Sequence, residues 1–526
     1  MAALHIAVHE FSKSACLCLF IDGLDEYEGD HLDIIQMVEI VRKLTLIPNV
    51  KACVSSRPSA VIADILAGFP HLKLQDLTFL DIQHFVESSL HKHALLPSLD
   101  GREDKALSEL IRRIVEKSEG VFLWVSLVVR SIRDGLIKGE PISSLSKKFD
   151  QLPSDLDGLY RWSLEKLPPS YLSDAFEIFQ ILRASQAQLV GRMSDEISEP
   201  VFTTIGLCYA LQNGQESVLR APIEILSQEK ELRLISWTLR ILRSRTEGLL
   251  TTYGNDQISL NGKSNHDTLV SYSHQTARIF LEQKDIWDKL ITSTSNKHFD
   301  PNLSILRSAV LQLKTLDFGQ MGNSLSEEIY HLGCWGLLDQ AISCARLVDE
   351  TYSGEMIALV NELDLTMTIQ LEKWSGKTLE NHWSSLLPLG FSRECEWHDT
   401  ILSFVISYGV FSYVFANAGD GDNALIAKKG RPLLDYAILP QPQQTIGDLD
   451  TRIIEYLLDL GADPNEGFCG ETVWSRFLTI YHKFIVGISN GSPQAKKLRK
   501  VFVLFVNFGA DPKVAMRIAF RYAKYH

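Results

Sequence analysis

The sequence lacks a G-x-x-x-x-G-K-[ST] loop, the motif whose backbone N–H groups and lysine hold the phosphates of a nucleotide. Two fragments, at residues 262–264 and 376–378, match only the last three positions of this motif. Gln257 and Leu371 stand where the first glycine of the motif is required. Neither fragment is therefore a phosphate-binding loop.

Paired cysteines and long apolar runs are also absent. The eight cysteines include no C-x-x-C pair, so we expect free thiols in a reducing compartment. The most apolar stretch, Val121 to Val129, is too short to span a bilayer, and no basic-plus-apolar signal peptide follows Met1. These absences predict a cytoplasmic protein.

Positive charge is in deficit, because 65 acidic residues outnumber 52 basic ones and leave a formal net charge of −13. This balance disfavours nucleic acids and anionic membranes as partners. The length of 526 residues and the hydrophobic content of 45% are enough for several domains with real cores.

What is present begins with a short apolar run, Cys16 to Ile21, that is followed by the carboxylates Asp22, Asp25 and Glu26. Such a run predicts a strand that is buried on both faces and delivers acids to a ligand crevice, as a Walker B strand does. Asp22 would hold Mg²⁺ through water, while Asp25 or Glu26 would orient or deprotonate the attacking water. The alternative is a buried strand followed by an acidic turn.

A second short strand begins at Val50 and stops at Ser55-Ser56-Arg57-Pro58. Apolar residues recur at helical spacing between Leu32 and Leu44, so the segment predicts a strand, a helix and a parallel strand. This crossover puts Arg57 at the same sheet edge as Asp22, where its guanidinium can reach a γ-phosphate. The alternative for Arg57 is a solvated turn residue.

Four segments in order, LCLFIDGLDEYEGD, KACVSSRP, LTFLDIQHFV and EKSEGVFLWVSLVVRSIRDGL, resemble the NACHT-type signal-transducing NTPases of filamentous fungi. The resemblance covers residues 1–290 and implies a multidomain α/β plus α fold. It implies a chain that starts inside the NTPase domain, without the strand, loop and helix that bind phosphate. The implied parts are the C-terminal part of a nucleotide-binding domain (1–80), a helical lid (81–150) and a helical plus winged-helix domain (151–290).

A hairpin is predicted further along, because the polar segment 254–267 separates two apolar strands that follow helices, as in a winged helix. The segment YSHQTARIFL resembles the winged-helix motif of the same family, in which a histidine faces the diphosphate of bound ADP. His274 stands at that position, and its imidazole can donate to a phosphate oxygen. A structural histidine at a strand-helix junction is the alternative.

The C-terminal part changes character. Residues 291–429 read as a helical connecting region without identifiable chemistry. Residues 430–526 resemble degenerate ankyrin repeats, with G-A-D-P copies at 461–464 and 509–512 that stand 509 − 461 = 48 residues apart. An ankyrin period is about 33 residues, so we expect an insertion over 488–497 in a solenoid of marginal length.

Three aromatic residues of this part, Tyr436, Trp474 and Tyr481, are candidate interface anchors, although each could equally be core, and for Trp474 the core is favoured. Residues 487–491 match the G-x-S-x-G nucleophile elbow of hydrolases. That motif requires an acid and then a histidine downstream, and the only later histidine is His526. We therefore reject a hydrolase.

The resemblance implies a NACHT/ankyrin signalling or protein-interaction protein of the fungal innate-immunity or incompatibility type. ATP or GTP with Mg²⁺ is the cofactor of the intact family, and its binding is expected to be weak or absent here, so the chain as given is not expected to be an enzyme. The alternative is a competent ATP- or GTP-dependent switch whose phosphate-binding loop is missing only from this gene model. Expected partners are proteins at the ankyrin-like region and a second copy of the chain, but not nucleic acid or membrane.

Overall fold

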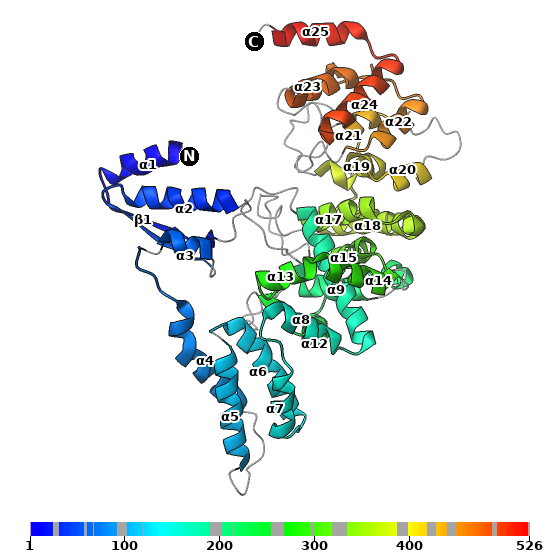
Figure 1. Cartoon of the computed structure of the whole chain (residues 1–526). Coiled ribbons are helices and arrows are strands. Elements are labelled where there is room, and N and C mark those ends of the chain that lie inside the picture. The colour runs from blue at the N-terminus through cyan, green and yellow to red at the C-terminus, as the bar shows by residue number, and fades with distance from the viewer. Residues whose placement is uncertain are drawn as a thin grey trace. The chain divides into compact units, whose positions relative to one another are not determined.

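The computed structural model describes residues 2–24, 31–56, 60–66, 68–91, 102–118, 120–189, 202–212, 214–253, 268–295, 299–317, 334–386, 398–417, 428–438, 449–485 and 492–523. The chain divides into two compact units, Met1–Ser143 and Ser144–His526. Its described part is mostly helical with small sheets, one of them two-stranded and parallel (Figure 1). The predicted parallel sheet and the predicted helical parts are both present.

The first unit contains the predicted strand–helix–strand crossover. β1 (Leu17–Ile21) pairs in parallel with β2 (Val50–Val54), and α2 (His31–Thr45) connects them in the chain. In the register of the pair, Leu17 stands opposite Val50 and Ile21 stands opposite Val54. Both strands therefore end at the same edge of the sheet.

One face of this sheet forms a core with the helices. Val8 of α1 (Ala2–Ser12) packs with Leu44 of α2 and Val50 of β2, and α3 (Ala60–Leu66) contributes a second cluster. On the opposite face Phe20 is 80% exposed. The prediction of a strand buried on both faces is therefore wrong, because burial along β1 alternates with the strand's own side-chain period.

The rest of the first unit is helical. α4 (Leu74–His91) packs on α5 (Arg102–Lys117) and α6 (Phe122–Ile137). The apolar run at Val121 to Val129 lies mostly in α6, where Trp124 and Val128 are buried as expected of a packing helix. None of the described helices is long and apolar enough to cross a membrane.

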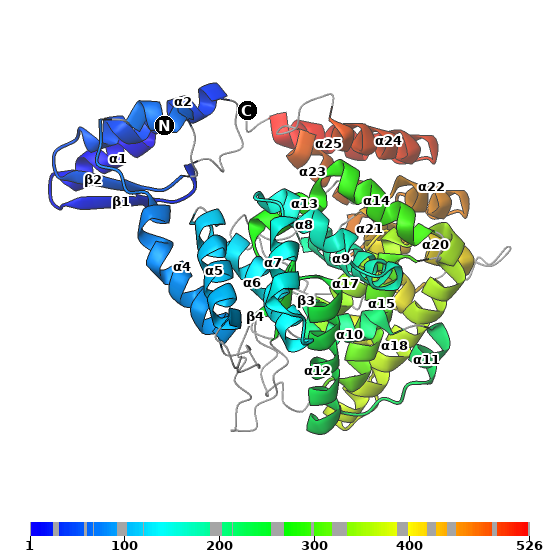
Figure 2. The ribbon, with the colours of Figure 1, turned by 60° about the horizontal axis from the view of Figure 1, so that its bottom comes forward.

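The second unit begins with helices around a three-stranded antiparallel sheet of order β3-β5-β4. Both strands of the predicted hairpin are present as β4 and β5, and Figure 2 shows β3 and β4 beside α10 and α12. The elements are α7 (Ile142–Asp150), α8 (Leu156–Glu165), α9 (Pro169–Leu189), β3 (Phe202–Thr203), α10 (Thr204–Leu211), α11 (Gln215–Arg220), α12 (Gln228–Arg245), β4 (Leu250–Tyr253), β5 (Leu269–Tyr272), α13 (Gln275–Glu282) and α14 (Lys284–Ser295).

A buried lysine holds the next helices together. Lys314 of α15 (Pro301–Thr315) is 1% exposed, and its Nζ donates to the carbonyls of Val218 and Ala221, each at 2.8 Å. The same ammonium group pairs with Glu362 at 2.7 Å. It therefore ties α11 to α15 and to α18 (Ser353–Ser375), beside which α17 (Cys334–Leu347) packs.

The C-terminal helices pack in two columns, which we call the helix stack (Figure 1). In one column α19 packs on α21, α21 on α23 and α23 on α25; in the other α20 packs on α22 and α22 on α24. The elements are α19 (Ile401–Ser407), α20 (Phe411–Asn417), α21 (Leu433–Ile438), α22 (Thr451–Asp459), β6 (Gly467–Phe468), β7 (Glu471–Thr472), α23 (Val473–Ile485), α24 (Pro493–Asn507) and α25 (Pro512–Ala523).

Two expectations about this part need correction, and one open alternative is resolved. The insertion expected over 488–497 is wrong in its second half, because α24 begins at Pro493. Tyr436 is 4% exposed and Trp474 is 1% exposed, so both are core, which was one of the two alternatives for Tyr436 and the favoured one for Trp474. Cys469 is disulfide-bonded, so the expectation of free thiols is wrong there. It holds for the other described cysteines, which are Cys16, Cys18, Cys53, Cys208, Cys334 and Cys344.

Candidate functional site

The predicted metal ligand Asp22 lies at the carboxyl edge of the β1–β2 sheet. Directly after β2, Ser55 donates its hydroxyl proton to the Asp22 carboxylate. The N–H of Gly23 in turn donates to Ser55 Oγ at 3.0 Å. The two strand ends therefore meet as the crossover predicted, and they join an exposed acid to a hydroxyl group.

The other residues predicted for this edge, Asp25, Glu26 and Arg57, lie outside the described residues. Among the described residues, no group of three or more His, Cys, Asp or Glu side chains could hold a metal ion. Magnesium binding at Asp22 and phosphate binding at Arg57 therefore stay predictions.

His274 has a definite structural task. It is the N-cap of α13, and its Nδ1 accepts the backbone N–H of Thr276 at 3.2 Å. In the neutral ring the proton is therefore on Nε2. The side chain is exposed, so this capping role does not exclude the predicted contact with a diphosphate, which stays a prediction.

Thr276, which His274 caps, also links α13 to α8. Thr276 Oγ1 lies 3.0 Å from His274 Nδ1 and 3.1 Å from the hydroxyl of Tyr160 in α8. The ring of Tyr160 also packs on Phe280, with 5.3 Å between ring centroids. Burial is the main cause that raises the pKa of Tyr160, so its hydroxyl stays protonated at neutral pH. His274 thus stands at the start of a helix that is fixed to α8.

One loop fragment and one serine cluster resemble catalytic motifs but have structural roles. Gly376 ends α18 in the left-handed conformation at φ 65°, which is a helix C-cap and not part of a phosphate-binding loop. His382 links Ser384 Oγ at 2.7 Å to Asp364 at 2.8 Å in the order of a catalytic triad. Ser384 is only 3% exposed, and its own N–H also donates to His382 Nδ1, so this histidine orders a buried turn.

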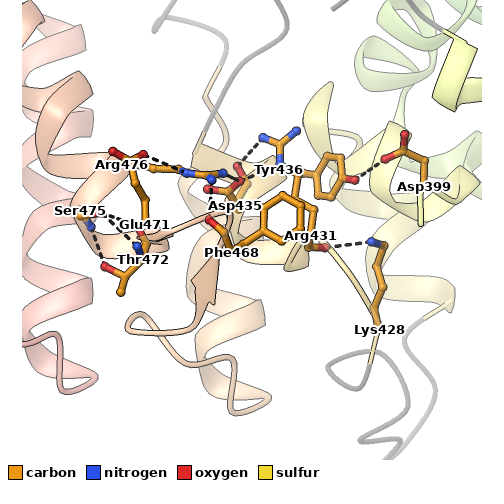
Figure 3. Close-up of polar contacts among 10 residues, drawn as sticks. All are labelled: Asp399, Lys428, Arg431, Asp435, Tyr436, Phe468, Glu471, Thr472, Ser475 and Arg476. Carbon is orange, nitrogen blue, oxygen red and sulfur yellow. Dashed lines mark hydrogen bonds and ion pairs between the residues drawn. The ribbon is translucent and has the colours of Figure 1, made fainter. Parts of the chain in front are cut away.

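The most developed polar cluster lies inside the helix stack (Figure 3). Asp435 of α21 accepts from Arg431 at 2.7 Å and from Arg476 of α23 at 2.6 Å. The carboxylate is 1% exposed, and Arg476 donates a further hydrogen bond to the carbonyl of Phe468 at 2.7 Å. The ion pair between Asp435 and Arg476 therefore joins the first turn of α21 to the first turn of α23.

A tyrosine and a lysine extend this cluster on the α19 side (Figure 3). The hydroxyl of Tyr436 donates to Asp399, and burial together with that carboxylate raises the pKa of Tyr436. Lys428 donates to the carbonyl of Arg431 at 2.9 Å, and burial lowers the pKa of this lysine to about 8. The centre of the cluster, Arg431, Asp435 and Tyr436, is buried. It therefore fixes the spacing of α19, α21 and α23 rather than presenting groups to a substrate.

Asn465, the residue directly after the first G-A-D-P copy, contacts the second copy. The side-chain amide of Asn465, the residue after the first copy, donates to the carbonyl of Gly509 at 2.9 Å and accepts the N–H of Asp511 at 2.8 Å. Both glycines of the copies, Gly461 and Gly509, have positive φ, which is typical of a glycine that ends a helix. The indole of Trp474 donates to the carbonyl of Asp511 at 3.0 Å and fixes the second loop from the other side.

Comparison with known families adds one match. Residues 166–324 match a family model described as Domain of unknown function (DUF7791). The match spans α9 to α15, so it includes the three-stranded sheet and His274. No NACHT, P-loop or ankyrin family was detected in the chain. No curated protein and no solved structure matches it.

Two contacts of the helix stack and the start of α24 were missed in the sequence analysis. The pairing of Asp435 with Arg476 and the bridge from Asn465 to Gly509 join residues more than forty positions apart, so no local signal could have found them. The start of α24 had a local signal, because Ser492 is a good N-cap and Pro493 suits the first helical position.

Proposed function

We propose that this chain is a NACHT-like signalling or protein-interaction protein, in which the helix stack recognises a protein partner and NTP hydrolysis is compromised. The observation that carries the proposal is the bridge from Asn465 to Gly509 and Asp511. It joins two copies of one helix-loop unit, and such units stack into recognition surfaces of the ankyrin type. The proposal keeps the expected cytoplasmic location.

Two features of the remaining chain support a NACHT-like origin. The crossover β1–α2–β2 holds Asp22 and Ser55 at one sheet edge, where nucleotide-binding folds place their ligands. The helices α9 to α12, with β3 among them, precede the hairpin β4–β5, and β5 is central in the sheet, as expected of a winged helix. We infer that His274 follows this winged helix as in the resembling family.

The second candidate function is a competent ATP- or GTP-dependent switch. The position of the exposed Asp22 at the carboxyl edge favours it, because a Walker B carboxylate holds Mg²⁺ from that place. The absence of a G-x-x-x-x-G-K-[ST] loop from these 526 residues disfavours it. Nucleotide turnover by the purified chain that Asp22→Ala abolishes would establish the second function.

Photo-crosslinking tests the recognition surface on the full chain. A benzophenone amino acid replaces exposed aromatic residues of the helix stack, Phe415 or Phe508, and in matched controls it replaces Trp237 of α12 or Trp374 of α18. We expect discrete protein adducts from the helix-stack positions only. Adducts from the control positions alone would place recognition outside the helix stack. Adducts between two copies of the chain alone would favour a homo-oligomer.

A further inference from the structure

Three aromatic rings gather on the surface of the helix stack where α20 packs on α22. The ring centroid of Phe415 in α20 lies 5.8 Å from that of Phe411 and 5.4 Å from that of Tyr456 in α22. Phe415 is 59% exposed, and the other two residues are half-buried. Asp459 follows Tyr456 by three residues and lies on the same side of α22. We call these four residues the α20–α22 face.

The packing of α20 does not require the exposed ring. Tyr413 and Val414 are the buried residues of this helix, and they supply its contact with the core. Phe415 keeps more than half of its surface in water and so forgoes much of the stabilisation that burial of a phenyl ring supplies. Aromatic side chains are enriched in protein interfaces, where they carry much of the binding energy. The ring of Phe415 therefore has the character of an interface anchor.

One ring of the face already binds a cation of the chain itself. The guanidinium carbon of Arg452 stands over the ring of Phe411 at 4.6 Å from its centroid. Asp450 pairs with this guanidinium at 2.7 Å and, together with Glu350, raises the pKa of Arg452. Arg452 is therefore satisfied within the fold and is not offered to a ligand. Its position shows that a guanidinium suits the rings of this face.

The charge of the face is negative. α20 has no charged residue, and α22 with its N-cap Asp450 has three acids and one arginine, which gives 1 − 3 = −2. Glu455 is paired with Lys500 of α24 at 2.8 Å, whereas in the described part of the chain no cation pairs with Asp459. Asp459 is exposed in the last turn of α22, where a carboxylate opposes the helix dipole. An occupant of the face must therefore cover an aromatic ring and also supply positive charge.

We propose that the α20–α22 face binds an arginine-bearing segment of a partner protein. The guanidinium of that arginine stacks on Phe415 and pairs with Asp459, while apolar side chains beside it cover Tyr456. One arginine can reach both groups, because Tyr456 lies between them, 5.4 Å from Phe415 and about 5–6 Å from Asp459 between Cβ atoms.

Charge complementarity selects this occupant. A guanidinium is planar, weakly hydrated and forked, so it can stack on a ring and pair with a carboxylate at the same time. The net charge of −13 on the chain adds a long-range attraction for a basic partner. The proposal rests on the proposed recognition function and names the partner's chemistry.

The test uses the full chain and fluorescence anisotropy of a labelled helical peptide that carries Arg and Leu on one face. In a second peptide citrulline replaces Arg, which keeps the shape of the side chain and removes its charge. Phe415→Leu keeps the apolar character of the site and removes the ring, and Asp459→Asn keeps the shape and removes the charge.

Matched control variants lie outside the helix stack. Phe122→Leu on α6 alters an exposed phenylalanine that also pairs with a second ring, that of Phe85, at 5.8 Å. Asp288→Asn on α14 alters an exposed aspartate. Circular dichroism checks that each variant keeps the helical content of the parent.

We expect the unaltered chain to bind the arginine peptide, with about a fivefold loss of affinity in Phe415→Leu and about a threefold loss in Asp459→Asn. The control variants should lose less than about 1.5-fold, and the citrulline peptide should bind at least about fivefold more weakly than the arginine peptide.

Absence of binding, equal affinity for the two peptides, or equal losses in the control variants overturns the proposal. So does a concentration-dependent dimer that Phe415→Leu abolishes and that forms in place of the peptide complex. Crosslinks from the Phe508 position that persist while the peptide fails to bind would refute this inference and leave the recognition function standing.

Discussion

The side-chain amide of Asn465 spans two loops, because it donates to the carbonyl of Gly509 at 2.9 Å and accepts the N–H of Asp511 at 2.8 Å. One residue thus satisfies a donor and an acceptor of the next G-A-D-P copy, which lies more than forty residues further along the chain. It couples α22 to the start of α25 through their loops. The stability of the helix stack should depend on this coupling.

Asn465→Ala should lower the free energy of unfolding by about 1–2 kcal/mol, since two hydrogen bonds between loops are lost. Urea unfolding followed by circular dichroism measures the change. Asn507→Ala is the matched control, because Asn507 is an exposed asparagine at the end of α24. A loss of similar size in both variants would contradict the bridging role.

Asp435→Ala should be the most destabilising single change in the helix stack, at about 3–5 kcal/mol, because it leaves the guanidiniums of Arg431 and Arg476 without their buried partner. A double-mutant cycle of Asp435→Asn with Arg476→Met should give a coupling energy of about 1–3 kcal/mol in urea unfolding. Additive effects of the two changes would show that the pair between α21 and α23 is not energetically coupled.

Stability should rise with pH above 8 through Lys428. Burial lowers the pKa of this lysine from 10.5 to about 8, so between these values the unfolded chain holds a proton that the folded chain has released. The loss of folding stability from burying the charged form of Lys428 is largest below pH 8, and it decreases as the pH rises. Because the site is only partly buried, screening by solvent reduces the gain to about 1 kcal/mol by pH 9.5. Urea midpoints between pH 7 and 9.5 should rise more in the parent than in Lys428→Met, and parallel curves would refute the assignment.

The capping and nucleotide roles of His274 can be separated by substitution. His274→Ala should destabilise the chain by about 1 kcal/mol, whereas His274→Ser should restore the cap, because a serine oxygen also accepts the N–H of Thr276. Thermal unfolding measures both. If the resemblance to the winged-helix motif extends to function, any ADP that copurifies with the protein should be reduced in both variants. Unchanged ADP content would mean that His274 acts only as the N-cap of α13.

The crossover β1–α2–β2 could be predicted because two short apolar runs, one ending at Asp22-Gly23 and the other at Ser55-Ser56, are separated by a segment with helical spacing of apolar residues. The exposure of Phe20 could not be predicted, since a run of apolar residues does not tell how many faces of a sheet are covered. The cluster around Asp435 was equally inaccessible. Its charges are 41 residues apart, and only the stacking of α21 on α23 brings them together.

The measurement that tests the account most directly is multiple-turnover hydrolysis of ATP and GTP by the purified full chain, with Mg²⁺ present. The account holds that this chain acts by binding a protein partner, because Asp22 can position a metal ion but no loop of the required sequence holds the phosphates. It predicts no turnover above that of a matched Asp22→Ala preparation. Sustained hydrolysis that disappears in Asp22→Ala would contradict it and establish the switch.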